Sequence, residues 1–507
     1  MKKFYVTTAI PYVNAPPHIG TMMDYLLADC LARYHRLNGL TVRFQAGTDE
    51  HGNKVARKAA EAGLSPQEYA DKLARNFEEA IRAADISYTD FIRTSDPKHQ
   101  RRVQEIWRRL KPHLYKANYT GWYCSGCESF VTDLAAAANN GVCPDHRQPY
   151  QRLNEENYFF KLSAFAETIK QAILAGKMTI QPDFRQKEVL QLLDGGLEDV
   201  SVSRPKQHVG WGVGVPDDDT QVIYVWIDAL SNYLTVLGYP DDEAWREFWP
   251  ADVQVIGKDI LRFHAAIWPA ILLALDLPLP KRLLAHGFVN IEGTKISKSL
   301  NNAISPRQII ETYGADAFRY YLLRHVPTLD DGDFTWEKFE NAYNGELGNE
   351  LGNLVQRVAA MIGRYQHGVI GDLPRPKHDT KPYHEAMQAM QLDRAFDFVF
   401  TSVRSLNVYL ENVQPWQVAK RRDQGDVEAE AHLGEILAYA ASSLEQIAFL
   451  LTPFMPRSAE IITKIFADGV ITPYQGVLFP RLYKHTPAPS GQSSNATPSS
   501  NESSKTV

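Results

Sequence analysis

Residues 4–21 read FYVTTAIPYVNAPPHIGT, and this stretch decides the fold. The apolar and β-branched run Phe4–Thr8 predicts a strand. A proline-rich turn follows, and from Ile19 onward apolar residues recur at helical spacing until Gly39 ends the helix. A strand that passes through a short turn into a helix is the first unit of a parallel α/β sheet.

The same alternation continues outward from this stretch. Residues 41–45 predict a second strand, and Ser65–Glu68 is a capping box that opens a helix. The alternation of strands and helices lapses between about residues 115 and 222. Strand patterns return at 222–226 and 253–257. Long amphipathic patterns over 337–465 predict a helical bundle.

These patterns predict an α/β fold. We expect a doubly wound parallel nucleotide-binding (Rossmann-like) domain, followed by an α-helical bundle domain. An insertion interrupts the first domain, and the spacing of Cys124, Cys127, Cys143 and His146 within it predicts a zinc knuckle. The expected parts are 1–115 for the first half of the Rossmann-like domain, 116–221 for the connective insertion, 222–336 for the second half, 337–485 for the bundle, and 486–507 for a disordered tail.

Composition limits the class of protein. The chain has 507 residues, of which 44% are apolar and 22% charged, as in ordinary globular proteins. No run approaches the ~20 apolar residues of a membrane span, and no signal peptide precedes the first strand. We therefore expect a cytoplasmic protein without membrane contact. The net charge of −6 argues against indiscriminate nucleic-acid binding but leaves a local basic surface open.

Two short motifs point to nucleotide chemistry. Residues 18–20 (HIG) lie where the first strand meets the first helix, the place where phosphates face helix-terminal N–H groups. Residues 295–299 (KISKS) form a basic loop suited to a triphosphate whose charge shifts as pyrophosphate departs. Alone, the first motif fits an ordinary turn and the second a solvated charge run. Together and in this order, they predict one adenylate-forming ATP site.

Three of the four cysteines fall between residues 124 and 143. Cys124, Cys127, Cys143 and His146 have the spacing of a zinc knuckle, in which thiolates and an imidazole surround the metal tetrahedrally. Four protein ligands leave no open position for a substrate. We therefore expect structural rather than catalytic zinc.

Two predicted helical stripes are rich in aromatic residues. Core packing is the ordinary interpretation of such stripes, but their aromatic density also fits a pocket for an apolar side chain. The stripes are Trp226, Ala229, Leu230 and Tyr233 on one helix, and Ile260, His264 and Trp268 on another.

The paired motifs resemble those of the class I aminoacyl-tRNA synthetases, and their surroundings are similar to the methionyl-tRNA synthetases within that class. The resemblance covers nearly the whole chain up to about residue 485. Besides the motifs and the knuckle, it rests on AIPY at 9–12, AGTDEHG at 46–52, YVWIDA at 224–229, the segment 257–270 and YGADA at 313–317.

The resemblance implies a site for each substrate: L-methionine, ATP with Mg²⁺, and tRNA(Met), whose anticodon the bundle would read. One structural Zn²⁺ per chain is also implied. The implied catalytic residues are His18, Lys295 and Lys298, and the implied ATP-binding residues are His18, Gly20, Lys295, Ser297 and Lys298. The implied methionine pocket comprises Ala9, Ile10, Tyr12, Asp49, Trp226, Ala229, Tyr233, Ile260, His264 and Trp268, with Asp49 holding the ammonium group. The implied anticodon readers are Asn353, Arg357 and Trp416.

The chain departs from the family pattern in three places. Thr21 stands where the first motif usually ends in a second histidine, and Leu230 stands where proline is frequent. No tRNA-binding module follows the bundle, so we expect a monomer.

Three alternative functions fit parts of the sequence. Synthetases for isoleucine, valine or leucine carry a much longer editing insertion than this chain can hold. A non-catalytic relative that binds tRNA or methionine is favoured only by Thr21. A small-molecule adenylyltransferase would have no use for the knuckle and the helical bundle.

Overall fold

The structure is a computed structural model that describes most of the chain. The described residues are 2–125, 129–131, 133–144, 147–296, 302–370, 379–466, 469–471 and 476–482. The expected disordered tail, 486–507, lies outside them. None of the described helices combines the length and the apolar character that crossing a bilayer requires.

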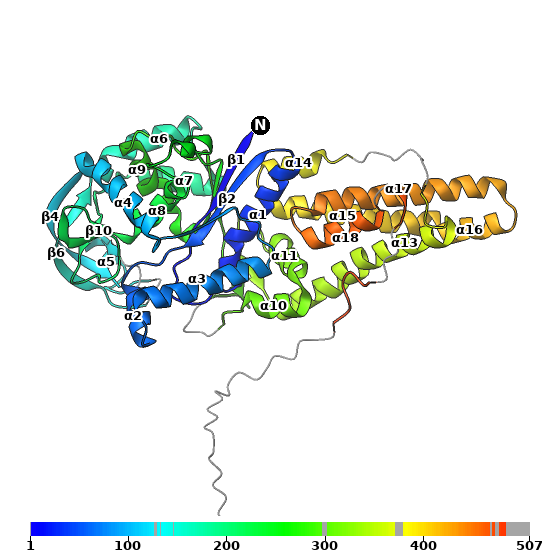
Figure 1. The fold of residues 1–507 in the computed structure, drawn as a ribbon, viewed down its shortest axis with the longest axis horizontal. Coiled ribbons are helices and arrows are strands. Elements are labelled where there is room, and N and C mark those ends of the chain that lie inside the picture. Colours follow the sequence, from blue (N-terminus) through cyan, green and yellow to red (C-terminus); the bar gives the residue numbers. More distant parts are fainter. Residues whose placement is uncertain are drawn as a thin grey trace, which may run out of the picture.

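A six-stranded sheet lies at the centre of the N-terminal body (Figure 1). Its order is β3–β2–β1–β12–β13–β7, and every neighbouring pair is parallel. The strands are β1 (Lys3–Thr8), β2 (Thr41–Thr48), β3 (Asp90–Arg93), β7 (Thr179–Gln181), β12 (Val253–Gly257) and β13 (Arg282–His286). The strand order reverses between β1 and β12, so this is the switch point where such sheets bind ligands.

Helices cover both faces of this sheet. In β1, Phe4 and Val6 pack into one core cluster, while Tyr5 packs into a second cluster on the other face. Helices α1, α3 and α11 contribute to the first cluster, and α4, α8 and α9 to the second. The predicted Rossmann-like parallel sheet is confirmed. The helices of this body are α1 (Met22–Leu37), α2 (Asn53–Glu61), α3 (Pro66–Ala83), α4 (Pro97–Leu110), α6 (Ala166–Leu174), α7 (Asp183–Asp194), α8 (Val225–Thr235), α9 (Trp268–Ala274), α10 (Pro306–Tyr313) and α11 (Ala315–Arg324).

The chain between the two halves of the sheet forms two antiparallel sheets. One has the order β5–β4–β6–β8 and the other β10–β11–β9. Their elements are β4 (Leu114–Cys124), β5 (Ser129–Val131), α5 (Asp133–Ala138), β6 (Gln151–Phe160), β8 (Val200–Ser201), β9 (Ser203–Pro205), β10 (Gly214–Val215) and β11 (Asp218–Ile223). Strand β7 comes from the same stretch of chain but joins the central sheet beside β13.

The strand expected at 222–226 is wrong in its end and its sheet. β11 ends at Ile223 and pairs only with β9 and β10 among the described strands. Helix α8 begins at Val225, so the apolar run continues as a buried helix. A short apolar run does not distinguish a buried strand from a buried helix, which explains the error.

The C-terminal half is helical, as predicted, and extends to one side of the α/β body (Figure 1). A small sheet of β14 (Val289–Ile291), β15 (Thr294–Lys295) and β16 (Gly332–Phe334) precedes it. The bundle helices are α12 (Trp336–Ala342), a π-helical segment (Tyr343–Gly352), α13 (Asn353–Tyr365), α14 (Lys381–Gln388), α15 (Leu392–Val413), α16 (Pro415–Asp423), α17 (Val427–Leu451) and α18 (Pro456–Phe466).

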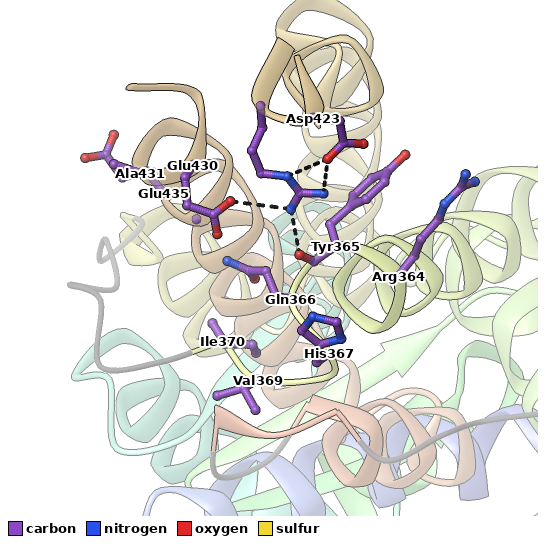
Figure 2. Close-up of a pocket in the computed structure, with 12 residues that line it drawn as sticks. Arg364, Tyr365, Gln366, His367, Val369, Ile370, Asp423, Glu430, Ala431 and Glu435 are labelled. Atoms are coloured by element: carbon purple, nitrogen blue, oxygen red, sulfur yellow. Dashed lines mark hydrogen bonds and ion pairs between the residues drawn. The ribbon is translucent and has the colours of Figure 1, made fainter. Parts of the chain in front are cut away.

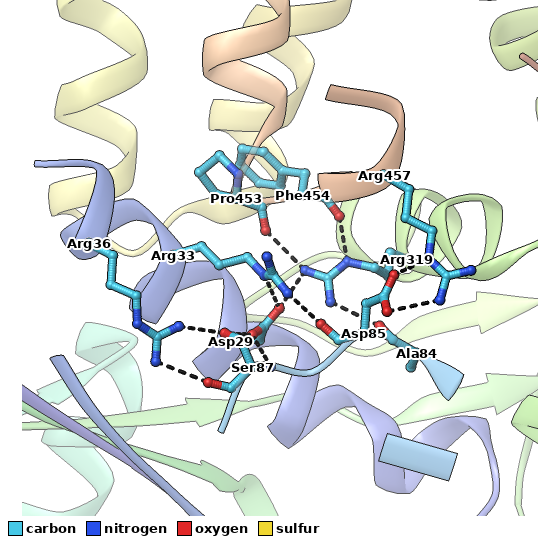
Figure 3. Close-up of polar contacts among 10 residues, drawn as sticks. All are labelled: Asp29, Arg33, Arg36, Ala84, Asp85, Ser87, Arg319, Pro453, Phe454 and Arg457. Carbon is cyan, nitrogen blue, oxygen red and sulfur yellow. Dashed lines mark hydrogen bonds and ion pairs between the residues drawn. The ribbon is translucent and has the colours of Figure 1, made fainter. Parts of the chain in front are cut away.

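A buried arginine joins the bundle to the α/β body (Figure 3). Arg319 of α11 donates to the carbonyl oxygens of Phe454 (2.6 Å) and Pro453 (3.0 Å), in the turn between α17 and α18. Its Nη2 also lies 2.7 Å from Asp29 Oδ2 on α1, and both side chains are fully buried. Burial alone would raise the pKa of Asp29, but Arg319, Arg33 and the hydrogen bonds from Ser87 together outweigh it, so this pKa is lowered. The helix that starts at the first motif is thus anchored to the bundle.

Candidate functional site

The turn before α1 holds His18 by reciprocal hydrogen bonds with Thr21. The Thr21 hydroxyl donates to the His18 carbonyl (2.7 Å) and accepts from the His18 N–H (3.0 Å). The Thr21 N–H donates to His18 Nδ1 (3.3 Å). Because Nδ1 acts as an acceptor, a neutral His18 ring carries its proton on Nε2. The departure from the family motif therefore has a structural role.

The two motifs meet in space. A Cβ atom added to Gly20 would lie 3.2 Å from Ile296 Cδ1 and 3.1 Å from the His18 ring, so glycine permits this approach. Lys295 is exposed at the end of β15, with its Nζ 4.5 Å from the Phe288 ring centroid. Asn302 Nδ2 donates to the Lys295 carbonyl (3.3 Å), which brings together the two ends of the loop. Ser297 and Lys298 lie outside the described residues.

Two helical segments on the other side of the switch point bring the aromatic stripes together. The Tyr233 hydroxyl lies 2.7 Å from His264 Nε2, and His264 Nδ1 lies 3.1 Å from the Ile260 carbonyl. Burial lowers the pKa of His264 to about 4, so the ring is neutral near pH 7. Nδ1 then donates to Ile260 and Nε2 accepts from Tyr233. The ring centroids of Tyr233 and Trp268 are 5.7 Å apart.

The second stripe is not one regular helix. Residues Phe263–Ile267 form a π-helical turn before α9, so the helical face expected for Ile260, His264 and Trp268 is modified there. Such turns recur at functional sites. Phe263 stacks on Trp226 of α8, with ring centroids 3.7 Å apart and planes inclined by 7°. Ala229, one turn further along α8, is buried.

Asp49 follows β2 and sits beside the end of β1. Its N–H donates to the Pro11 carbonyl (2.9 Å), and its own carbonyl accepts from the Val13 N–H (3.0 Å). Tyr12 and Asp49 form a parallel bridge, and Ala9 donates to the Val255 carbonyl (2.9 Å). The fourth candidate here, Ile10, packs against Gly47, where an added Cβ would lie 3.0 Å from Ile10 Cγ2. These residues therefore gather at the carboxyl ends of neighbouring parallel strands.

Sequence reasoning missed a buried polar cluster beside this pocket. It consists of His51, His99 and Asp228, with side chains at most 3% exposed. The available signal was Asp228, the only charged residue in the buried helix 225–235, because a buried charge requires partners. Its histidine partners come from distant parts of the chain, so their identity could not be read from spacing.

The three predicted anticodon residues lie in the bundle. Asn353 and Arg357 share one face of α13, and Asn353 is exposed. Arg357 Nη2 donates to Asn407 Oδ1 on α15 (2.8 Å), and α15 leads into α16, where Trp416 is 39% exposed.

A cavity of about 920 Å³ lies at the end of α13 (Figure 2). Arg364, on its rim, follows Arg357 by about two helical turns and so lies on the same face. Arg422 also lines the cavity, but Asp423 (2.8 Å) and Glu430 (3.5 Å) pair with it. The cavity therefore has mixed charge and lies apart from the residues predicted to bind methionine and ATP.

Two of the four predicted zinc ligands belong to the described residues. Cys124 and Cys143 are buried in one small cluster with Ala136 and Tyr150. Cys143 lies in a tight turn, with its N–H donating to the Gln148 carbonyl (2.9 Å), and Ser125 Oγ lies 3.3 Å from Gln148 Oε1. Cys127 and His146 lie outside the described residues. Within the described ranges, no three His, Cys, Asp or Glu side chains are grouped as a metal site would require.

Comparison with known proteins gives a consistent family. Residues 4–153 and 147–359 match the family described as tRNA synthetases class I (M). The chain is 42% identical over 489 residues to the methionine–tRNA ligase of Caldanaerobacter subterraneus, covering 93% of this chain and 74% of that protein. It is 41% identical over 483 residues to the methionine–tRNA ligase of Streptomyces coelicolor, covering 90% of this chain and 88% of that protein.

A solved structure has the same fold. Mycobacterium tuberculosis methionyl-tRNA synthetase in complex with methionyl-adenylate superposes with a TM-score of 0.87 at 35% sequence identity. The match covers 95% of this chain and 100% of that one. The free-state structure of the M. tuberculosis protein gives a TM-score of 0.81 at 32% identity, over 96% and 99% of the two chains.

Proposed function

The chain belongs to the methionine–tRNA ligases, and from that membership we propose a role for each part of its site. The enzyme activates methionine with ATP and charges tRNA with it. First, a methionine carboxylate oxygen attacks the α-phosphorus of ATP, the bond to the bridging β-phosphate oxygen breaks, and pyrophosphate leaves. A terminal ribose hydroxyl of tRNA then attacks the methionyl carbonyl carbon. The bond from this carbon to the phosphate oxygen breaks, and AMP leaves with the hydroxyl proton on its phosphate. Neither step needs a nucleophile from the protein, so positioning and charge stabilisation suffice.

The proposed methionine site lies between β1, β2, α8 and the segment that leads into α9. Its proposed residues are Ala9, Ile10, Tyr12, Asp49, Trp226, Ala229, Tyr233, Ile260, His264 and Trp268. A thioether packs well against aromatic rings, which supports the aromatic wall. The neutral His264 adds no charge to an apolar pocket, whereas the Asp49 carboxylate suits the substrate ammonium.

The proposed ATP site lies where the two motifs meet. His18 would donate from Nε2 to a phosphate oxygen, and Gly20 lets the nucleotide approach the backbone. Lys295 and Lys298 would stabilise the negative charge that develops on the departing pyrophosphate, with the Ser297 hydroxyl beside them. The close approach of Ile296 to Gly20 is the single observation that carries this assignment, because it joins residues far apart in the sequence. Mg²⁺ enters with ATP as part of the substrate.

Asn353, Arg357 and Trp416 are proposed to read the CAU anticodon. Amide, guanidinium and indole groups suit unstacked loop bases, which are recognised by hydrogen bonding and stacking. The exposure of Asn353 and Trp416 supports this role, since neither side chain is needed to fill the core.

A structural Zn²⁺ site is proposed at Cys124, Cys127, Cys143 and His146. The burial of Cys124 and Cys143 in one small cluster, beside the hydrogen bond between Ser125 Oγ and Gln148 Oε1, fits a knuckle. When bound, zinc would cross-link the two segments that carry these cysteines, and no catalytic step involves it. Metal analysis checks this site: stoichiometric zinc that is lost in Cys143→Ser supports it, and its absence from the purified protein refutes it.

The remaining proposals concern organisation. We propose a connective insertion at 116–221 between two catalytic halves at 1–115 and 222–336, an anticodon-binding domain at 337–485 and a tail at 486–507. A monomeric, cytoplasmic enzyme is proposed, in keeping with the absence of a membrane-spanning helix among the described residues.

ATP–pyrophosphate exchange tests the site assignment directly. Exchange should depend on methionine and not on isoleucine, valine or leucine. Lys298→Ala should reduce it roughly a hundredfold or more, as loss of one preorganised charge-stabilising group does. Unchanged exchange in Lys298→Ala would show that the KISKS loop does not act as proposed, whereas no exchange in the native chain, with tRNA still bound, would favour a non-catalytic relative.

A further inference from the structure

A buried polar cluster lies behind the methionine wall of α8. Asp228 projects from α8 about 200° around the helix axis from Trp226, so it faces away from the aromatic wall. Its Oδ2 lies 2.7 Å from His51 Nδ1, and its Oδ1 lies 2.9 Å from His99 Nε2. The side chains of all three residues are at most 3% exposed.

Asp228 carries the charge of the cluster, and both of its carboxylate oxygens are hydrogen-bonded. His99 Nδ1 lies 2.7 Å from the hydroxyl of Thr235, near the end of α8, so α4 and α8 are joined at two points. Burial would raise the pKa of Asp228, but His51 and His99 outweigh it and lower this pKa to about 2. Asp228 is therefore an ionised acceptor for two imidazole N–H groups, and a buried charge of this kind is costly to displace from its partners.

The same cluster holds the segment that carries Asp49. The next residue, Glu50, is fully buried and accepts two hydrogen bonds from Arg93 (2.7 and 2.8 Å). His51 follows, with its ring centroid 5.0 Å from that of Trp211. Trp211 Nε1 also donates to the Glu50 carbonyl (2.5 Å). The backbone after Asp49 is thus held from three directions.

We propose that Asp228, together with His51 and His99, is a positioning residue that sets the distance between the Asp49 carboxylate and the Trp226–Ala229 wall. Asp228 lies between Trp226 and Ala229 in the helix, and His51 is two residues from Asp49, so short rigid connections lead from the cluster to both sides of the pocket. The three side chains are at most 3% exposed, so they act through the residues that they hold. The inference rests on the proposed role of Asp49 as the ammonium ligand.

Binding of two related ligands distinguishes a misplaced Asp49 carboxylate from general damage to the pocket. Methionine and 4-(methylthio)butanoate share the carboxylate and the thioether, but only methionine has the ammonium group. Dissociation constants for both, measured by calorimetry at 25 °C, give a selectivity ratio for each variant. In Asp228→Asn we expect the affinity for methionine to fall roughly tenfold or more, because a small misplacement of a positioned group has a cost of that size. The affinity for the desamino acid should change less than about twofold.

Control variants show whether a changed selectivity ratio is specific to the Asp228 cluster. Asp29→Asn, at another fully buried carboxylate, should leave the selectivity ratio unchanged. His51→Asn keeps an N–H near the position of Nδ1 and should retain most of the ratio, whereas His51→Leu should lose it. Equal losses of both ligands in Asp228→Asn, or an unchanged ratio, would overturn the inference. If Asp49→Asn also leaves the ratio unchanged, the proposed ammonium role is wrong; if Asp49→Asn lowers it and Asp228→Asn does not, only the positioning inference is wrong.

Discussion

Replacing Thr21 by alanine should slow adenylate formation without weakening methionine binding. The hydroxyl of Thr21 makes two hydrogen bonds with the backbone of His18, at 2.7 and 3.0 Å. Alanine removes both but leaves the bond from its own N–H to the His18 ring. The turn would then hold the imidazole less firmly in the orientation that presents Nε2 to phosphate.

The structure sets the size of the effect. Loss of a hydroxyl cap costs about 0.5 to 2 kcal/mol, and the site is only partly buried, so the lower half of that range applies. Each 1.4 kcal/mol is about tenfold in rate, which predicts a roughly two- to eightfold lower kcat for exchange. The KM for methionine should stay within about twofold, because the hydroxyl of Thr21 bonds to His18, which is not among the residues proposed for that pocket.

Pre-steady-state adenylate formation, followed by pyrophosphate release, measures this step apart from tRNA charging. Thr21→Ser is the matched control, since it keeps the hydroxyl and should retain nearly the native rate. If Thr21→Ala and Thr21→Ser are equally fast, or if the alanine variant loses methionine affinity instead, the reasoning about His18 is refuted.

Three other variants test separate parts of the molecule. Tyr233→Phe leaves buried His264 Nε2 without its donor at a cost of about 1–3 kcal/mol, so the KM for methionine in exchange should rise about tenfold while the KM for ATP is unchanged. Asp29→Asn leaves Arg319 buried without its charged partner and should lower the free energy of urea unfolding by roughly 3 kcal/mol at pH 7. The folded pKa of Asp29 lies below its ordinary value of 3.8, so the stability that its ionised form contributes is complete above pH 3.8 and is lost as the pH falls through the folded pKa. The difference in unfolding free energy between native protein and variant should therefore shrink at low pH. A difference that stays constant with pH would contradict the assignment. Trp416→Ala should lower kcat/KM for tRNA charging by the equivalent of about 1–3 kcal/mol, a lost base-stacking contact, with exchange unaffected; an equal loss in both assays would exclude a role confined to tRNA.

Much of the fold follows from local sequence patterns. The first strand, α1 with its stop before Gly39, the Ser65–Glu68 capping box and the helical second half are all present as predicted. Each depends on periodicity or capping chemistry within a few neighbouring residues, which the sequence records directly. The run at 222–226 failed because buried strands and buried helices have the same composition.

The candidate site divides along the same line. Residue types and their spacing in the sequence were enough to identify the two motifs and the two aromatic stripes. Tertiary structure decided that Ile296 packs on Gly20, that Tyr233 bonds to His264, that β7 joins the central sheet, and that Asp228 meets two histidines from other elements. These contacts join residues separated by tens to hundreds of positions, and no local period encodes such a pairing. They form only when the path of the chain through the sheet has brought the partners together.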